Sequence, residues 1–346
     1  MIITHSIFRY LITHLYLVKS ILFIFLLLAF SAKAQLTQEE SDLVSKLNFT
    51  NTIPTDLIST RSLVLYQNAF TKAELEETQT FFQQTGIDAV AYFDIARVLA
   101  GHDTRKAYSN YFNVRGIKFL ILLQKNQKGY QYIFCTFIGN KEMVDKTSIA
   151  WKQENASLTE LLKIVYRFAV SNLKKQNFLI NDLPETDMPM NTFTGRINEN
   201  FSIEVKTFKT AIPRLGNSKD DAELESYLKE NFPVKYELVD AMADEDALLL
   251  KGFRTVLRFV HTRGMLAKEI LGYDVTQLAR SLPTTTFVNG EAQIKTIPAN
   301  EPVYKFYFRS IEYGNIFLGP RWDADVTWQD ALKNHIQALK IDQKIN

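Results

Sequence analysis

The sequence predicts an α/β or α+β protein with two similar domains, each a mixed sheet with helices packed on it. Three observations support this fold class. Apolar runs of strand length alternate with amphipathic helix patterns. Turn signals at 126–129 and 289–290 join neighbouring runs as hairpins, which excludes all-parallel sheets. The same order of elements recurs in the second half of the 346-residue chain. We divide the chain into a signal peptide at 1–34, a helical and linking segment at 35–60, a first α/β domain at 61–180, a linker at 181–200 and a second α/β domain at 201–346.

The first half carries clear local start and stop signals. Thr71 and Glu74 have the spacing of a capping box, and Gly86 is placed to end the helix that this box opens. Gly101 is expected to bend the helical pattern at 94–112, because glycine weakens a helix interior. The remaining expected elements are a helix at 37–47, strands at 62–66, 87–93, 117–123 and 130–138, and a helix opened by Ser157 and Glu160 whose apolar stripe predicts packing on a sheet.

The second half repeats this pattern with weaker signals. Asn289 and Gly290 form a strong hairpin turn signal, and Thr327 with Asp330 has capping-box spacing at the start of the last helix. Alternating apolar residues at 201–208 are typical of a strand. The other expected elements are helices at 218–231 and 265–278 and strands at 234–239, 253–260, 284–288, 291–297, 303–308 and 316–318.

Both halves therefore run strand, helix, strand, helix, hairpin, helix. An ancient duplication explains this order, and two unrelated α/β domains that share a common order are the alternative. The succession of elements at 71–138 resembles the TPM domains of bacterial envelope proteins. No diagnostic motif accompanies the resemblance, so it assigns no functional residue.

The N-terminus indicates export. Arg9 and Lys19 precede an apolar run at 21–30, and Ala32-x-Ala34 fits the small-residue rule for cleavage before Gln35. A membrane-spanning helix needs about 20 apolar residues, which favours a cleaved signal over a retained anchor. We expect a periplasmic or secreted protein, of the kind a Gram-negative bacterium exports, with no stable membrane span after cleavage.

Composition and motifs exclude several functions. Removing the three cations of the signal segment from the 40 Lys and Arg leaves 37 against 38 Asp and Glu, so the mature chain has no basic field for nucleic acid. No glycine-rich phosphate loop follows a strand, and no paired Cys or His-Glu-x-x-His occurs. The single thiol, Cys135, cannot form an internal disulfide and is expected to be a buried core residue.

Histidine and carboxylate side chains provide the catalytic candidates. His261 follows a strand-like run, and a pair with Asp274 or Asp240 would make it a general base. Arg263, two residues later, is a candidate binding residue. A polar turn with His261 in solvent is the simpler interpretation.

The segment at 321–325 provides the remaining candidates. Asp323 and Asp325 are the best ligand pair for a divalent cation, the one cofactor we consider, and Arg321 and Trp322 are candidate binding residues beside them. Capping of the last helix by Asp325 and Thr327 is the simpler alternative.

These observations do not specify one activity. We expect a non-catalytic exported or envelope-associated protein that binds a protein or a glycan, with its site in the crease between the halves. The alternative is an extracytoplasmic hydrolase that uses a His–carboxylate pair or a carboxylate-bound cation. The oligomeric state is left open.

Overall fold

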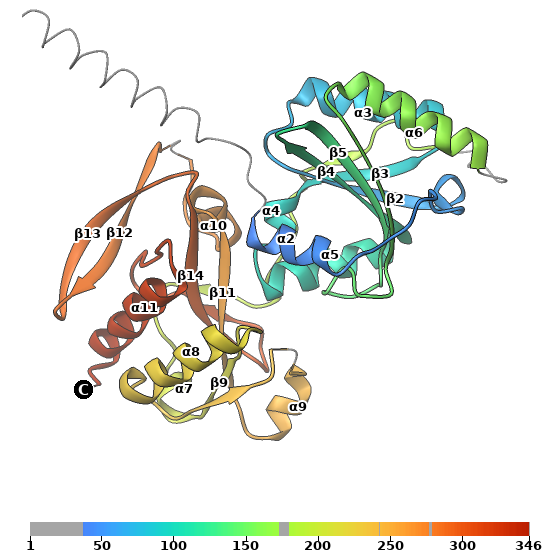
Figure 1. Ribbon diagram of the computed structural model, residues 1–346. Coiled ribbons are helices and arrows are strands. Elements are labelled where there is room, and N and C mark those ends of the chain that lie inside the picture. Colours follow the sequence, from blue (N-terminus) through green and yellow to red (C-terminus); the bar gives the residue numbers. More distant parts are fainter. Residues whose placement is uncertain (1–36, 173–179, 242, 277–278, 346) are drawn as a thin grey trace, which may run out of the picture.

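The computed structural model describes residues 37–172, 180–241, 243–276 and 279–345. Within them, the chain forms a seven-stranded sheet, a six-stranded sheet and a two-stranded hairpin, with helices on the faces of the two large sheets (Figure 1). The mixed α/β fold class is thereby confirmed. The predicted signal peptide at 1–34 lies outside the described residues. None of the described helices combines the length and the apolar character that a membrane span requires.

The first sheet is parallel at its centre and antiparallel at one side. Strand β2 pairs in parallel with β3 and with β4, and β4, β5 and β6 follow as antiparallel neighbours. The strands are β1 (Asn48–Phe49), β2 (Arg61–Tyr66), β3 (Asp88–Asp94), β4 (Ile117–Asn126), β5 (Gly129–Thr136), β6 (Ile149–Asn155) and β7 (Glu185–Thr186). The helices are α2 (Gln38–Ser45), α3 (Lys72–Thr85), α4 (Ile95–Val98), α5 (His102–Val114) and α6 (Leu158–Asn172).

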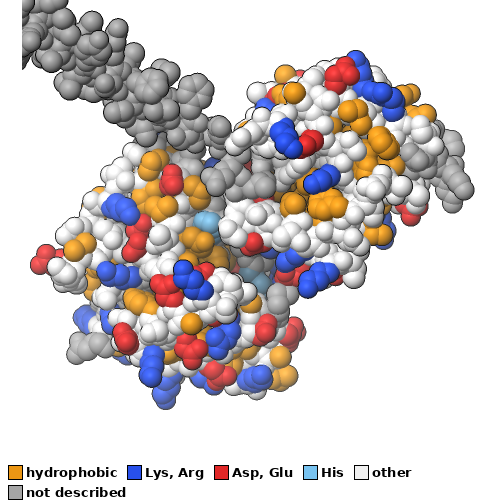
Figure 2. Space-filling model, viewed as in Figure 1, with side chains coloured by type: hydrophobic (Ala, Val, Ile, Leu, Met, Phe, Trp, Pro, Cys, Tyr) orange, Lys and Arg blue, Asp and Glu red, His pale blue; other side chains and the backbone are white. Residues whose placement is uncertain are grey.

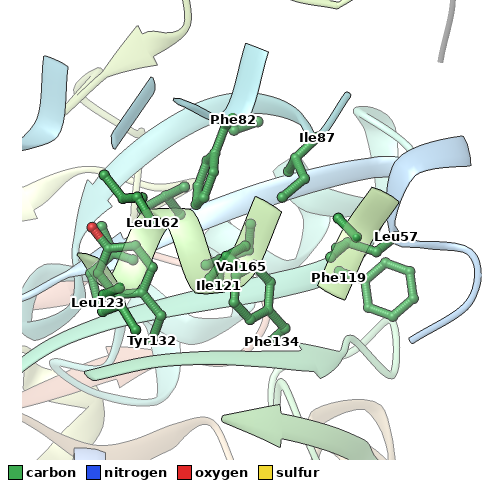
Figure 3. Close-up of a cluster of buried hydrophobic side chains, with 14 of the residues drawn as sticks. Leu57, Phe82, Ile87, Phe119, Ile121, Leu123, Tyr132, Phe134, Leu162 and Val165 are labelled. Atoms are coloured by element: carbon green, nitrogen blue, oxygen red, sulfur yellow. The ribbon is translucent and has the colours of Figure 1, made fainter. Parts of the chain in front are cut away.

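Both faces of this sheet are buried, which explains why its central strands are apolar at almost every position. Ile121 and Phe134 point to the face covered by α3 and α6, where Phe82 and Val165 join them (Figure 3). Alternate residues of the same strands, such as Leu120 and Cys135, point to the other face, toward α2 and α5. Cys135 is fully buried, as the sequence predicts, and its thiol donates to the backbone carbonyl of Leu120 at 3.6 Å.

The second sheet is built from β8 (Ile197–Asn198), β9 (Thr210–Pro213), β10 (Tyr236–Val239), β11 (Thr255–Arg263), β14 (Pro302–Ser310) and β15 (Ile316–Phe317). Along the chain, the hairpin of β12 (Ser281–Val288) and β13 (Glu291–Pro298) lies between β11 and β14, which pair directly with each other in the sheet. The helices are α7 (Ile203–Thr207), α8 (Ser218–Asn231), α9 (Glu245–Leu250), α10 (Gly264–Ile270) and α11 (Trp328–Gln343). Helices α8 and α11 share one apolar cluster on the sheet, as α3 and α6 do in the first half.

Five consecutive strands have the same order and the same directions in the two sheets. The order β3-β2-β4-β5-β6 matches β10-β9-β11-β14-β15. Strand β9 is parallel to β10 and β11, as β2 is to β3 and β4, and the next two pairings are antiparallel in both sheets. The recurring order of elements expected from the sequence therefore corresponds to a recurring topology.

Local signals located most helix ends correctly. Thr71 and Glu74 form the expected capping box, and Gly86 ends α3 in the left-handed conformation, at φ 91°. The helical pattern at 94–112 breaks into α4 and α5 at Gly101, and α11 begins after its cap, Thr327.

Four expectations need correction. Residues 201–208 form α7 rather than a strand, because the Ser202 side chain caps Glu204 N and because Phe201 and Val205, four residues apart, are buried together. The strand of this region is the short β9, which the pattern missed. Strand β6 was missed because only Ala150 and Trp151 of its residues are buried. The helix expected at 265–278 ends at Ile270, and the expected linker contains β7 and β8, which pair with β3 and β15.

The halves meet where α4 and α5 of the first half run beside β11 of the second (Figure 1). Gly101 forms an antiparallel bridge to Val260, and His261 N donates to the carbonyl of Ala100 at 2.6 Å. A Cβ atom at Gly101 would lie 2.5 Å from the carbonyl oxygen of Phe259, so this contact requires glycine.

Candidate functional site

Two neighbouring parallel strands of the first sheet end in polar residues at the junction of the halves. Gln67 directly follows β2, and Asp94 ends β3. The chain leaves β2 toward α3 on one face and leaves β3 toward α4 and α5 on the other. Adjacent carboxyl ends that diverge in this way form the crevice in which open α/β sheets commonly bind ligands.

Helix α2 and the end of β11 cover this crevice and leave a cavity of about 100 Å³, which we call the junction cavity. Arg263 forms an ion pair with Asp94, and His261 Nδ1 contacts the carboxylate of Glu39. The His261 ring also stacks on Tyr304, with 3.8 Å between ring centroids. The polar groups that the sequence singled out here are therefore paired across the junction.

Of the titratable groups that line the junction cavity, Glu40 has the pKa that departs most from its ordinary value. Its Oε2 accepts a hydrogen bond from Gln67 Nε2 at 2.7 Å, and its side chain is 3% exposed. Burial raises the pKa of Glu40 to about 7, and the nearby carboxylates of Asp94 and Glu39 act in the same direction. A carboxyl that exchanges its proton near neutral pH has the property of a general acid or base.

The carboxylate that pairs with His261 is Glu39 and not Asp274, which corrects the pairing drawn from the sequence. Asp274 is exposed just after α10, and its Oδ1 accepts from the backbone N of Thr276 at 2.9 Å. Sequence separation explains the error, because Glu39 lies 222 residues from His261.

Asp323 and Asp325 bind cationic side chains rather than sharing one open site. Asp323 lies 2.6 Å from Lys305 Nζ and 3.1 Å from His335 Nδ1, all three fully buried. Asp325 lies 2.7 Å from Lys295 Nζ and accepts from its neighbour's backbone N. A divalent cation would have to displace these lysines, so the geometry does not favour the predicted metal pair.

The capping alternative for this segment is correct for one of its two residues. Thr327 is the N-cap of α11, and its side chain accepts from the backbone N of Asp330 at 3.2 Å. Asp325, two residues earlier, is engaged by Lys295 instead.

The three predicted binding residues have different surroundings. Arg321 is exposed, and Trp322 is partly buried between Tyr273, at 5.1 Å edge to face, and the Lys268 ammonium, at 5.1 Å from its ring. Arg263 lines the junction cavity and is held by Asp94.

A larger depression, which we call the groove, lies on the same junction with a volume of about 660 Å³ (Figure 2). Helix α5 and the loop at 139–142 form its wall in the first half. The segment at 243–246, Arg309 and Ile311 form its wall in the second half. Most of these side chains are polar or charged, so the groove presents hydrogen-bonding groups from both halves.

A charged cluster lies between this groove and the second sheet. Its cations are Lys106, Lys141, Arg258 and Arg309, and its carboxylates are Asp103 and Glu245. Burial raises the pKa of Glu245, but Arg309 and Arg258 outweigh burial and lower this pKa to about 2. Glu142, Asp244 and Asp246 also line the groove, so five carboxylates face these four cations and the site carries both charges with no excess of positive charge.

His102 is a neutral member of this cluster. Its Nε2 lies 2.8 Å from Lys141 Nζ, which can only donate, so Nδ1 carries the proton and donates to Asp103 at 3.2 Å. Burial lowers the pKa of His102, in keeping with this neutral form.

His102, Asp103 and Glu245 also have the spacing of metal ligands, with ligand atoms within 4.8 Å of one another. Arg258 lies 3.1 Å from Glu245 and Arg309 contacts the same carboxylate, so this ligand set is occupied by cations. A metal ion would have to displace these guanidinium groups, so the geometry does not favour metal binding here.

Sequence reasoning missed Glu39, Glu40, Lys141 and Arg258 as site residues. Glu39 and Glu40 resemble the acidic first turn of any helix, and Arg258 is one cation in an apolar strand. One sequence signal could have located the charged cluster. Arg258 is a charged residue within an apolar strand, and a buried charge requires a partner of opposite charge.

No known protein-family model matches the chain, and no curated protein matches its sequence. The resemblance to TPM domains is therefore one of element order alone.

Proposed function

We propose that the chain is an exported, non-catalytic binding protein of a bacterial envelope, periplasmic or secreted, that holds a protein or glycan partner in the groove. The groove carries this proposal. Its volume of about 660 Å³ falls within the range of about 300–1,000 Å³ usual for ligand sites, and both halves supply its walls.

The candidate catalytic groups support binding over catalysis. His261 forms a His–carboxylate pair with Glu39, but its ring is stacked on Tyr304 and its side chain is only 12% exposed, so little of the ring is open to a substrate. Burial raises the pKa of the Cys135 thiol to about 12, which removes its reactive thiolate at neutral pH. The junction cavity, at about 100 Å³, is small for a substrate.

A hydrolase is the second candidate, and Glu40 is the observation that favours it. A carboxyl with a pKa of about 7 beside His261 and Arg263 has the components of an acid–base site. Ester, phosphate and glycoside substrates tested on the chain from Gln35 would distinguish the two functions. Turnover that Glu40→Gln abolishes supports the hydrolase, and absence of turnover across the set supports binding.

Export and duplication complete the proposal. The apolar run at 21–30 followed by Ala32-x-Ala34 supports cleavage before Gln35. Expression in a Gram-negative host followed by mass spectrometry of the N-terminus tests it, and a mature protein that begins elsewhere contradicts it.

The matching strand order of the two sheets supports an origin by duplication.

A substitution that fills the groove tests the binding proposal. Asn110 is exposed on α5 and lines the groove, so Asn110→Trp should block it without disturbing the core. Glu230→Trp, at an exposed position of α8 outside the groove, is the matched control. We expect peptides or envelope glycans that bind the parent chain to lose affinity only for Asn110→Trp. Equal binding by both variants would contradict a site in the groove.

A further inference from the structure

A second, apolar cavity of about 150 Å³ opens at the carboxyl end of β9. Ile212, Leu224, Leu257 and Phe306 form its apolar wall, and Ala241 also lines it. A space of this size accommodates one apolar side chain of the size of leucine.

Arginine side chains border this apolar space. Arg258 lines it and is 6% exposed; one of its terminal nitrogens donates to Glu245 at 3.1 Å. Among the described residues, no acceptor reaches its buried Nε. Arg214 lines the same cavity, is 41% exposed at its side chain and forms an exposed ion pair with Glu225 at 3.5 Å, which a ligand carboxylate would have to replace. An apolar cavity beside a buried guanidinium with spare donor capacity is suited to a ligand that has both a carboxylate and an apolar group.

The apolar cavity adjoins the groove, because His102 lines both. The charged cluster, which contains Arg258 and Arg309, lies where the two meet. The polar groove, the charged cluster and the apolar cavity therefore follow one another along the surface of the protein.

We propose that this arrangement binds the carboxyl terminus of a protein partner whose last residue is apolar, such as Leu, Val or Phe. The upstream residues lie in the groove, the terminal carboxylate lies at the arginines, and the last side chain fills the apolar cavity. In a terminal residue the carboxylate and the side chain leave the same Cα atom, which matches a cation placed directly beside an apolar cavity. A neutral glycan provides neither group. The proposal rests on the proposed binding function and names its partner class.

Labelled pentapeptides of sequence Gly-Ser-Gly-Ser-X, with X as Leu, Val, Phe or Lys, test this proposal by fluorescence anisotropy. Each is prepared as the free acid and as the C-terminal amide, and N-acetyl-leucine serves as the competitor that lacks an upstream chain. The protein is the chain from Gln35. We expect the Leu, Val or Phe acids to bind at least about tenfold more tightly than their amides and than the Lys peptide, since a charge-assisted hydrogen bond is lost in each amide.

Variants assign this binding to the cavity. Arg258→Gln should weaken the acid peptides by about tenfold. Ala241→Phe should weaken them by filling the cavity, and the half-exposed Arg214→Gln should do so without risk to the core. Arg61→Gln, an exposed arginine at the far end of β2, is the matched control and should bind as the parent does.

Equal affinity for acid and amide would overturn the proposal, as would tight binding unaffected by Arg214→Gln and Ala241→Phe. N-acetyl-leucine that binds as tightly as the pentapeptide would overturn the assignment to a protein terminus and indicate a small free acid. A different outcome is that no peptide binds, whereas a glycan binds the parent chain and fails to bind Asn110→Trp. This result would overturn the present inference and leave the proposed function intact. If neither class binds, both fail.

Discussion

Asp323→Asn should destabilise the second half strongly at neutral pH. The Lys305 side chain is fully buried, and Asp323 Oδ1 lies 2.6 Å from its Nζ. The substitution keeps the shape of the side chain but removes its charge, and leaves Lys305 with the Leu318 carbonyl at 2.6 Å and a histidine. Breaking a buried ion pair by neutralising one partner costs about 3–5 kcal/mol.

The pH dependence gives a second, independent readout. Burial lowers the pKa of Lys305 below its usual value, although Asp323 opposes this shift. With Asp323 neutralised, the pKa of Lys305 in the folded state should fall further, while the unfolded chain keeps the ordinary value of about 10.4. The unfolded state then binds more protons over this interval, so the stability of the variant should rise with pH up to about 10, more steeply than in the parent.

Urea unfolding at pH 7 and pH 9.5, followed by tryptophan fluorescence, measures both effects. Asp325→Asn is the matched control, because its partner Lys295 is 43% exposed and keeps its charge in water; we expect a loss of about 1 kcal/mol. Adding Lys305→Met to Asp323→Asn should recover stability by removing the stranded charge. A loss for Asp323→Asn no larger than for Asp325→Asn, with the same slope against pH, would refute the reasoning.

Three further predictions concern the junction and the first core. Raising the pKa of the buried Glu40 carboxyl from 4.5 to about 7 makes stability fall as pH rises through that interval, because the folded state holds the proton. Glu40→Gln should therefore gain up to about 3 kcal/mol over the parent between pH 5 and pH 8 in urea unfolding, and parallel pH profiles would contradict this. Gly101→Ala should lower stability by about 1–3 kcal/mol, because its Cβ would press on the Phe259 carbonyl; an unchanged melting temperature would contradict this. Cys135, buried with its pKa raised to about 12, should react with a thiol reagent at pH 8 only after unfolding, and rapid labelling of the native chain would contradict its burial.

The sequence predicted the elements whose signals are local. Thr71 with Glu74, Gly86 and Thr327 set helix ends through contacts within a few residues, so their spacing is enough. The turn at Asn289 and Gly290 fixed the hairpin of β12 and β13 for the same reason. The error at 201–208 arose because apolar residues there satisfy the period of a strand as well as the i, i+4 spacing that buries Phe201 and Val205.

The site was only partly accessible from the sequence. His261 and Arg263 were singled out from the sequence, and the structure places both at the junction. Their partners Glu39 and Asp94 lie 222 and 169 residues away, and no local pattern pairs them.

What the sequence determined by itself is the fold class and the succession of elements, because capping, turn geometry and hydrophobic period act over a few residues. What only the tertiary structure decided is the shared strand order of the two sheets, the pairing of Lys305 with Asp323, and the groove and cavity at the junction. These depend on strand neighbours and on charges brought together from distant segments. In particular, Arg258 next to Glu245 is a consequence of how β11 and α9 pack, which the order of residues does not encode locally.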